Sequence, residues 1–117
     1  MTSPAAVLFD LDCTLIDRRA SIAAYAERFR EQFAGDLASE LPETIEVLVS
    51  ADGQGYRAAQ RPGDIVQGLR WTDDPPPPGR VDEHWREHFP GCSVAMAGAH
   101  EVLRTLRQHD IPIGLIT

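Results

Sequence analysis

The sequence has no lysine and no asparagine, so all eleven of its basic residues are arginines. Any positive charge that these residues bring to a site is therefore a guanidinium. The two cysteines, Cys13 and Cys92, are too few for a disulfide framework, and we expect a reducing compartment, the cytoplasm. No apolar run approaches the roughly 20 residues that cross a membrane. The first ten residues, MTSPAAVLFD, contain no basic stretch, so we expect no signal peptide.

The net charge of −7 limits the class of partner. Nucleic-acid binding needs a basic surface, and docking on an anionic membrane needs one too, so we expect neither. An acidic protein can still bind a small phosphorylated metabolite when a metal ion offsets the local charge. The length of 117 residues corresponds to about one domain.

Apolar patterning predicts two buried strands at opposite ends of the chain, over residues 5–10 and 111–117. Helices are expected between them, over residues 19–33, 39–50, 65–69, 80–89 and 98–109. The four prolines at 75–78 indicate a stiff connector. Two buried strands joined through a helix favour a parallel sheet, and so an α/β fold.

The stretch VLFDLDCTLID places Asp10 and Asp12 directly after the first predicted strand, and Thr117 ends the second. Ligands of open parallel sheets bind beyond the carboxyl ends of the strands, so the three side chains are expected to face one crevice. One carboxylate can attack phosphorus while a second carries the proton to and from the reacting oxygens. Mg²⁺ takes oxygen ligands and would remove the repulsion between two carboxylates and a phosphate.

The first of these motifs resembles the D-x-D-x-T-L signature of the haloacid dehalogenase-like (HAD) hydrolase superfamily, and the C-terminal IPIGLIT resembles its second motif. The resemblance implies a Rossmann-type parallel sheet with an inserted α-helical cap. By position, Asp10 would be the nucleophile and Asp12 the general acid and base, with both as Mg²⁺ ligands. Thr14 would support the motif loop and Thr117 would bind the phosphoryl group, and both are expected substrate-binding residues. An acid at position 12 implies a phosphatase.

The domains that this resemblance implies are a core formed by residues 1–17 and 93–117 and a helical cap formed by residues 18–92. The family's third and fourth motifs, a basic residue and further acids, would follow Thr117. We therefore expect a truncated enzyme that is weakly active or inactive as this chain. The alternative is a non-catalytic fragment or partner-dependent module that self-associates through an unpaired sheet edge.

The pattern HWREH offers a different chemistry, because it matches the H-x-x-E-H motif of some zinc peptidases. On a helix, His84 and His88 would share a face and could bind zinc, with Glu87 as the base. A third ligand would have to follow, and Glu101 is the one glutamate that does. The structural alternative is an amphipathic helix that buries Val81, Trp85 and Phe89 and carries both histidines on its flank.

Other side chains have expected places in the fold. We expect Tyr56 and Trp71 to pack in a core, although they could line a pocket of the cap. The glutamates at 40, 43 and 46 are expected to form a solvated face. In the helix over 98–109, the residues expected to point inward are Ala99, Val102, Leu103 and Leu106.

Overall fold

The structure, a computed structural model, describes residues 7–10, 16–111 and 113–116, and side chains are considered for residues 16–111. The chain divides into two compact units. One unit, called the strand unit, combines Met1–Arg18 with Ser93–Thr117. The other, called the helical unit, is Arg19–Cys92.

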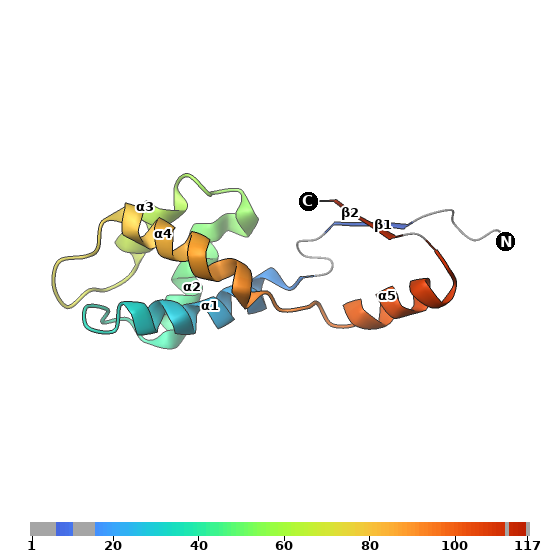
Figure 1. Cartoon of the computed structure of the whole chain (residues 1–117). Coiled ribbons are helices and arrows are strands. Elements are labelled where there is room, and N and C mark those ends of the chain that lie inside the picture. The colour runs from blue at the N-terminus through green and yellow to red at the C-terminus, as the bar shows by residue number, and fades with distance from the viewer. Residues whose placement is uncertain (1–6, 11–15, 112, 117) are drawn as a thin grey trace. The chain divides into compact units, whose positions relative to one another are not determined.

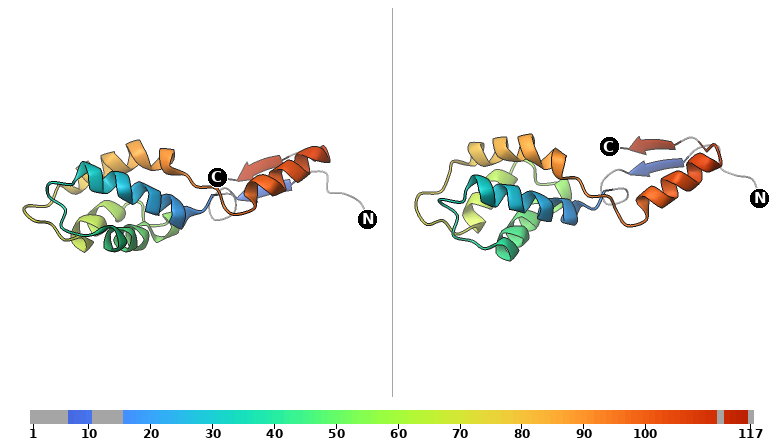
Figure 2. Two further views of the ribbon diagram at one scale, coloured as in Figure 1. Left: turned by 90° about the horizontal axis from the view of Figure 1, so that it is seen from below. Right: turned by 60° about the horizontal axis from the view of Figure 1, so that its bottom comes forward.

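Helices dominate the described residues, and the predicted α/β fold with a Rossmann-type parallel sheet is wrong. The strands found are β1 (Val7–Asp10) and β2 (Ile113–Ile116), which pair in parallel and lie side by side in Figures 1 and 2. Two strands of four residues each form a ribbon, whereas an α/β fold needs a wider sheet with a helical layer on each face. Apolar runs predict where strands occur, but they do not predict how many strands join them.

The strand unit also contains a helix, α5 (Ala99–Gln108), which follows an isolated antiparallel bridge between Ile16 and Ala95. The backbone N–H of Asp17 donates to the carbonyl of Val94 over 2.8 Å next to this bridge. The segment before α1 and the segment before α5 are therefore tied together.

The predicted inward face of α5 is only partly correct. Ala99 is buried, Leu103 and Leu106 are half-buried, and Val102 is exposed, with 46% of its surface accessible. The periodicity of the helix correctly indicates which residues share a face. It carries no information about how much of that face a neighbouring element covers.

The helical unit is built from α1 (Arg18–Gln32), α2 (Leu41–Asp52), α3 (Arg61–Gly68) and α4 (Pro78–His88), with α1 beginning one residue before its boundary. Two short 3-10 helices, Gly53–Gly55 and Phe89–Cys92, follow α2 and α4. Figure 1 shows the four α-helices gathered in one group. None of the described helices is long and apolar enough to cross a membrane.

The core of the helical unit lies on the predicted apolar stripe of α1. Ile22, Tyr25, Phe29 and Phe33 are almost completely buried, which confirms that stripe. The buried residues that the other helices contribute include Leu48, Ala51, Ile65, Val81 and Trp85. Aromatic rings meet edge to face here, with 4.9 Å between the centroids of Tyr25 and Trp85. Such pairs stabilise a core by about 0.5–1.5 kcal/mol beyond the area they bury.

Proline and glycine mark the ends of these helices. α4 starts at Pro78, after Pro77 in an extended conformation, so the proline run leads into a first turn where a missing N–H costs nothing. α2 ends at Gly53, whose φ of 54° is left-handed and whose N–H donates to the carbonyl of Val49. Ser39 makes no cap for α2; its Oγ accepts a hydrogen bond from the backbone N–H of Arg70 instead.

The two aromatic residues expected in a core, Tyr56 and Trp71, differ in how far they are buried. Trp71 packs against the core, and its indole N–H donates to the carbonyl of Val66 over 2.9 Å. Tyr56 is 89% exposed, so its predicted core position is wrong. It follows the 3-10 turn at Gly53–Gly55, which carries the chain away from the helices that bury Ala51 and Asp52.

Candidate functional sites

The carboxyl ends of the two strands meet at one edge of the ribbon. The register pairs Asp10 with Ile116, so the last residue of β1 lies beside the last residue of β2. Asp10 is placed here by its backbone alone. Asp12, Thr14 and Thr117 lie outside the described residues. The backbone register therefore brings position 10 next to the residue that precedes Thr117.

A hydrogen-bonded pair of side chains, Tyr25 and His84, lies inside the helical unit. The Tyr25 hydroxyl and His84 Nδ1 are 2.7 Å apart, and both side chains are buried. Tyr25 comes from the core stripe of α1 and His84 from α4, one turn before His88. The prediction that both histidines lie on the flank of their helix is therefore wrong for His84. The pair ties α1 to α4 through a polar contact within an aromatic cluster.

Burial sets the protonation of this pair. Burial, and secondarily the nearby Cys92, raises the pKa of the Tyr25 hydroxyl well above its ordinary value, so it stays protonated. Burial, and secondarily the neighbouring His88, lowers the pKa of His84 below its ordinary value. A neutral imidazole has one protonated and one unprotonated nitrogen. Because Nδ1 is engaged with Tyr25, Nε2 is the nitrogen left to bind a ligand.

A small cavity of about 130 Å³ adjoins His84. The residues that line it are Gln32, Phe33, Arg80, Glu83, His84, Glu87 and His88. The rings of His84 and His88 lie with their centroids 4.4 Å apart. Glu87 Oε2 is 3.9 Å from His88 Nε2. Across the described residues, no group of three or more His, Cys, Asp or Glu side chains could hold a metal ion, so they supply no third ligand for a peptidase zinc.

A buried ion pair joins the end of α2 to the start of α3. Asp52 Oδ1 and Arg61 Nη1 are 3.4 Å apart, and the two side chains are 1% and 10% exposed. The Arg61 guanidinium also lies over the Trp85 ring, 4.2 Å from its centroid. A cation over an aromatic face is attracted by the ring's electron density. Arg61 therefore joins α2, α3 and α4, which is a structural role.

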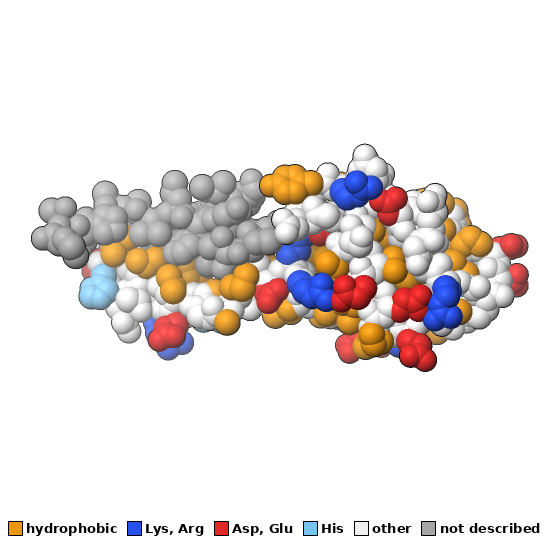
Figure 3. All heavy atoms as spheres, turned by 180° about the vertical axis from the view of Figure 1, so that it is seen from behind, with side chains coloured by type: hydrophobic (Ala, Val, Ile, Leu, Met, Phe, Trp, Pro, Cys, Tyr) orange, Lys and Arg blue, Asp and Glu red, His pale blue; other side chains and the backbone are white. Residues whose placement is uncertain are grey.

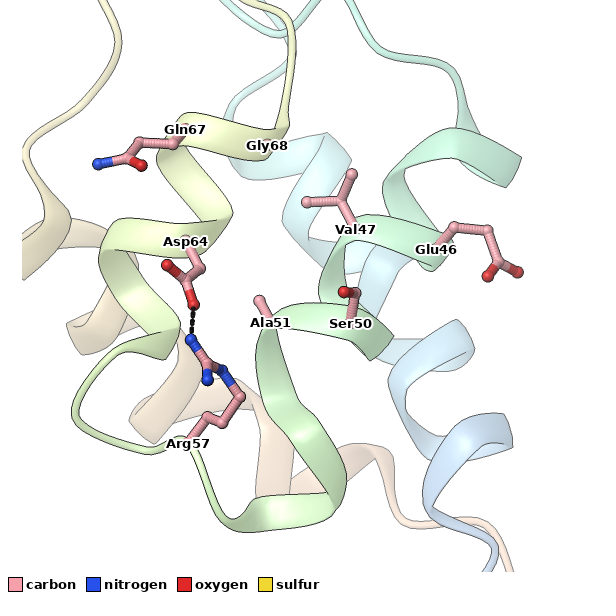
Figure 4. A pocket seen from close by; sticks show the side chains of 8 residues that line it. All are labelled: Glu46, Val47, Ser50, Ala51, Arg57, Asp64, Gln67 and Gly68. Atoms are coloured by element: carbon pink, nitrogen blue, oxygen red, sulfur yellow. Dashed lines mark hydrogen bonds and ion pairs between the residues drawn. The ribbon is translucent and has the colours of Figure 1, made fainter.

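A wider groove of about 660 Å³ opens between α2 and α3 (Figure 4). Its lining residues are Glu46, Val47, Ser50, Ala51, Arg57, Asp64, Gln67 and Gly68. The helices approach closely here, since a side chain at Gly68 would meet Val47 Cγ1 at 2.8 Å. Both acids of the groove are paired, Asp64 with Arg57 over 2.7 Å and Glu46 with Arg19. The groove therefore offers no unpaired charge to a phosphate.

Two of the three glutamates that were expected to form a solvated face, Glu43 and Glu46, make exposed ion pairs. Arg70 makes three contacts of 2.7–3.2 Å with the carboxylate of Glu43. Figure 3 shows acidic and basic side chains interspersed over the visible face. The sequence could not predict these partners, because Arg19 and Glu46, like Glu43 and Arg70, are 27 residues apart.

No protein-family model, curated protein or solved structure matches this chain. The inferences about function consequently rest on residue chemistry and geometry. The sequence analysis missed the Tyr25–His84 and Asp52–Arg61 pairs because each joins residues from different helices. The one available signal was a histidine at the core-facing spacing of α4, three residues after the buried Val81.

Proposed function

We propose that this chain is a phosphomonoester hydrolase that forms an aspartyl-phosphate on Asp10. The observation that carries the proposal is the parallel register of Asp10 with Ile116. The D-x-D-x-T motif begins at the carboxyl end of β1 in the sequence, and Thr117 follows that of β2, the strand beside it. The resemblance of these two motifs to HAD hydrolases gives the same assignment of roles.

The proposed reaction has two steps. An Asp10 carboxylate oxygen attacks phosphorus, the bond to the leaving oxygen breaks, and protonated Asp12 supplies a proton to the departing alcohol. Water then attacks the phosphorus of the aspartyl-phosphate, and Asp12 takes the water's proton. The bond between phosphorus and the Asp10 oxygen breaks, which restores the Asp10 carboxylate and releases inorganic phosphate. The hydroxyls of Thr14 and Thr117 donate hydrogen bonds to phosphoryl oxygens.

The donor set suits a hard divalent cation, because Asp10 and Asp12 offer only oxygen atoms. The Asp10 carboxylate and the Asp12 backbone carbonyl would hold Mg²⁺, which would neutralise charge on the phosphoryl oxygens. The expected substrate is a small phosphorylated metabolite. We expect slow turnover, because positive charge does much of the work in phosphoryl transfer and the sequence contains no lysine.

Covalent labelling tests the proposal more directly than turnover does. Purified chain is incubated with ³²P-labelled acetyl phosphate and Mg²⁺, then denatured in acid and treated with hydroxylamine, which cleaves acyl phosphates. We expect a hydroxylamine-sensitive label that disappears in Asp10→Asn and persists in Asp73→Asn, the matched change at an exposed acid. No label in the unaltered chain, or equal labelling of Asp10→Asn, would refute the proposal.

The second candidate is a non-catalytic module that associates with a partner or with itself through the strand unit. The exposure of Val102 on an otherwise apolar helix face favours it. A two-stranded ribbon is also marginally stable alone. Size-exclusion chromatography with light scattering distinguishes the candidates, since a monomer at all concentrations argues against self-association.

A further inference from the structure

We propose that His84 and His88 form a binding site for one divalent transition-metal ion, of the kind represented by Ni²⁺ and Cu²⁺. The proposal concerns the helical unit alone and is independent of the phosphatase proposal. It also differs from a peptidase zinc centre, because it uses two imidazoles and leaves the remaining coordination positions to water. The juxtaposition that carries it is a pair of histidine rings one helical turn apart at the wall of a small polar cavity.

The spacing of the two rings suits a shared metal ion. Metal–nitrogen bonds of about 2 Å put the centres of two imidazole rings on one ion roughly 4.5–5 Å apart, the lower value applying when the bonds meet near a right angle. The rings of His84 and His88 have centroids 4.4 Å apart and are tilted by 41°. The ring spacing is therefore compatible with two imidazoles on one ion. A right angle suits tetragonal ions, of which Ni²⁺ and Cu²⁺ are the common cases, better than tetrahedral Zn²⁺.

The hydrogen bond with Tyr25 already orients the His84 ring. Metal-binding histidines usually donate their other ring N–H to a fixed acceptor, which sets the tautomer and the ring orientation. The Tyr25 hydroxyl lies 2.7 Å from Nδ1 and can accept that hydrogen. In the tautomer in which Nδ1 donates to Tyr25, Nε2 is unprotonated and can bind the ion. Tyr25 would act as a positioning residue, since it touches the ligand and not the metal.

The charged side chains that line the cavity also favour a cation. Glu83 and Glu87 line the cavity together with a single cation, Arg80, whose guanidinium lies over the Phe33 ring. Together Glu83, Glu87 and Arg80 carry a formal charge of −1. The cavity therefore favours a cation over an anion.

Titration of the full chain with Ni²⁺ near neutral pH tests the site. Calorimetry should give one Ni²⁺ per chain. His88→Gln should weaken the association at least tenfold, because His88 is only half-buried and its loss leaves the core intact. The controls are His100→Gln and His109→Gln, at exposed histidines of the strand unit, and each should change the association less than twofold.

A second measurement covers variants that disturb folding. Copper electron paramagnetic resonance should show nitrogen couplings from two imidazoles in the unaltered chain and from one in His88→Gln. Tyr25→Phe should keep both couplings but weaken Ni²⁺ association severalfold, as expected for a positioning residue. Unchanged Ni²⁺ affinity in His88→Gln, or a loss that follows His100→Gln or His109→Gln instead, would overturn the proposal.

Discussion

The helical unit and the strand unit differ in how completely they cover the apolar faces of their helices. In the helical unit, α1 buries its whole aromatic stripe, and Tyr25 and Phe29 have no accessible surface. In the strand unit, α5 is strongly amphipathic in sequence, yet Ala99 is its one buried residue among those described. An apolar stripe therefore marks a face that needs covering. Whether it is covered depends on other elements.

The largest expected difference between the units comes from truncating one side chain in each. Phe29→Ala should lower the free energy of unfolding by about 3–5 kcal/mol, because it leaves a cavity among aromatic rings. Val102→Ala should change it by about 0.5 kcal/mol or less, as at other exposed positions. Urea denaturation followed by far-UV circular dichroism measures both. Similar losses would show that α5 is as well covered as α1.

Two ion pairs near the turn between α2 and α3 give the next contrast. Arg61→Met should cost about 3 kcal/mol, because it leaves the charge of Asp52 buried. The pair Asp52→Leu with Arg61→Met should recover much of that loss. Arg57→Met, in the half-exposed pair with Asp64, should cost about 1 kcal/mol or less. The urea midpoint of each variant tests this, provided that the dependence of the unfolding free energy on urea stays the same. Equal losses of stability in Arg61→Met and Arg57→Met would show that burial of the pair does not matter.

A smaller effect should come from pH. The pKa of His84 is lowered by burial in the folded chain, so between that value and about 6.5 the unfolded chain binds more protons. The contribution of a neutral His84 to the free energy of unfolding is therefore fully present above about pH 6.5. It is lost as the pH falls from about 6.5 through the lowered pKa of the folded chain. Urea denaturation at several pH values should show this slope. His84→Gln should flatten it, whereas His109→Gln should not.

The smallest effect should come from the exposed contact between Glu43 and Arg70. The hydrogen bond from Arg70 lowers the pKa of Glu43, but both groups are open to solvent. We expect Glu43→Gln to leave the denaturation midpoint nearly unchanged, with any difference disappearing at high salt because exposed charges are screened. A loss comparable with that of Arg61→Met would show that surface pairs carry unexpected weight here.

The sequence predicted the helices of the helical unit well, because each combines an apolar stripe with a proline or glycine near an end. The predicted helix over 19–33 is α1 (Arg18–Gln32), and the predicted helix over 80–89 is α4 (Pro78–His88). The predicted fold class was wrong, and for a reason that does not apply to the helices. Two apolar runs show that strands exist, but the size of a sheet depends on pairing between segments, which no local pattern contains.

The candidate sites differ in the same way. D-x-D-x-T and H-x-x-E-H are local patterns, so they can be recognised in the sequence without a structure. The Tyr25–His84 hydrogen bond joins residues 59 positions apart, so the burial of His84 could not be read from its neighbours along the chain. Polar residues on a core-facing position are where sequence reasoning is weakest, because their partners decide whether they can be buried.

The distribution of aromatic residues has a practical consequence. Both tryptophans, Trp71 and Trp85, and both tyrosines, Tyr25 and Tyr56, belong to the helical unit, and the strand unit contains neither type. Intrinsic fluorescence therefore reports on the helical unit only, whereas far-UV circular dichroism adds the signal of α5 to that of the other helices. If the two optical signals change at different urea concentrations, the units melt as separate cooperative blocks, and no added label is needed to see it.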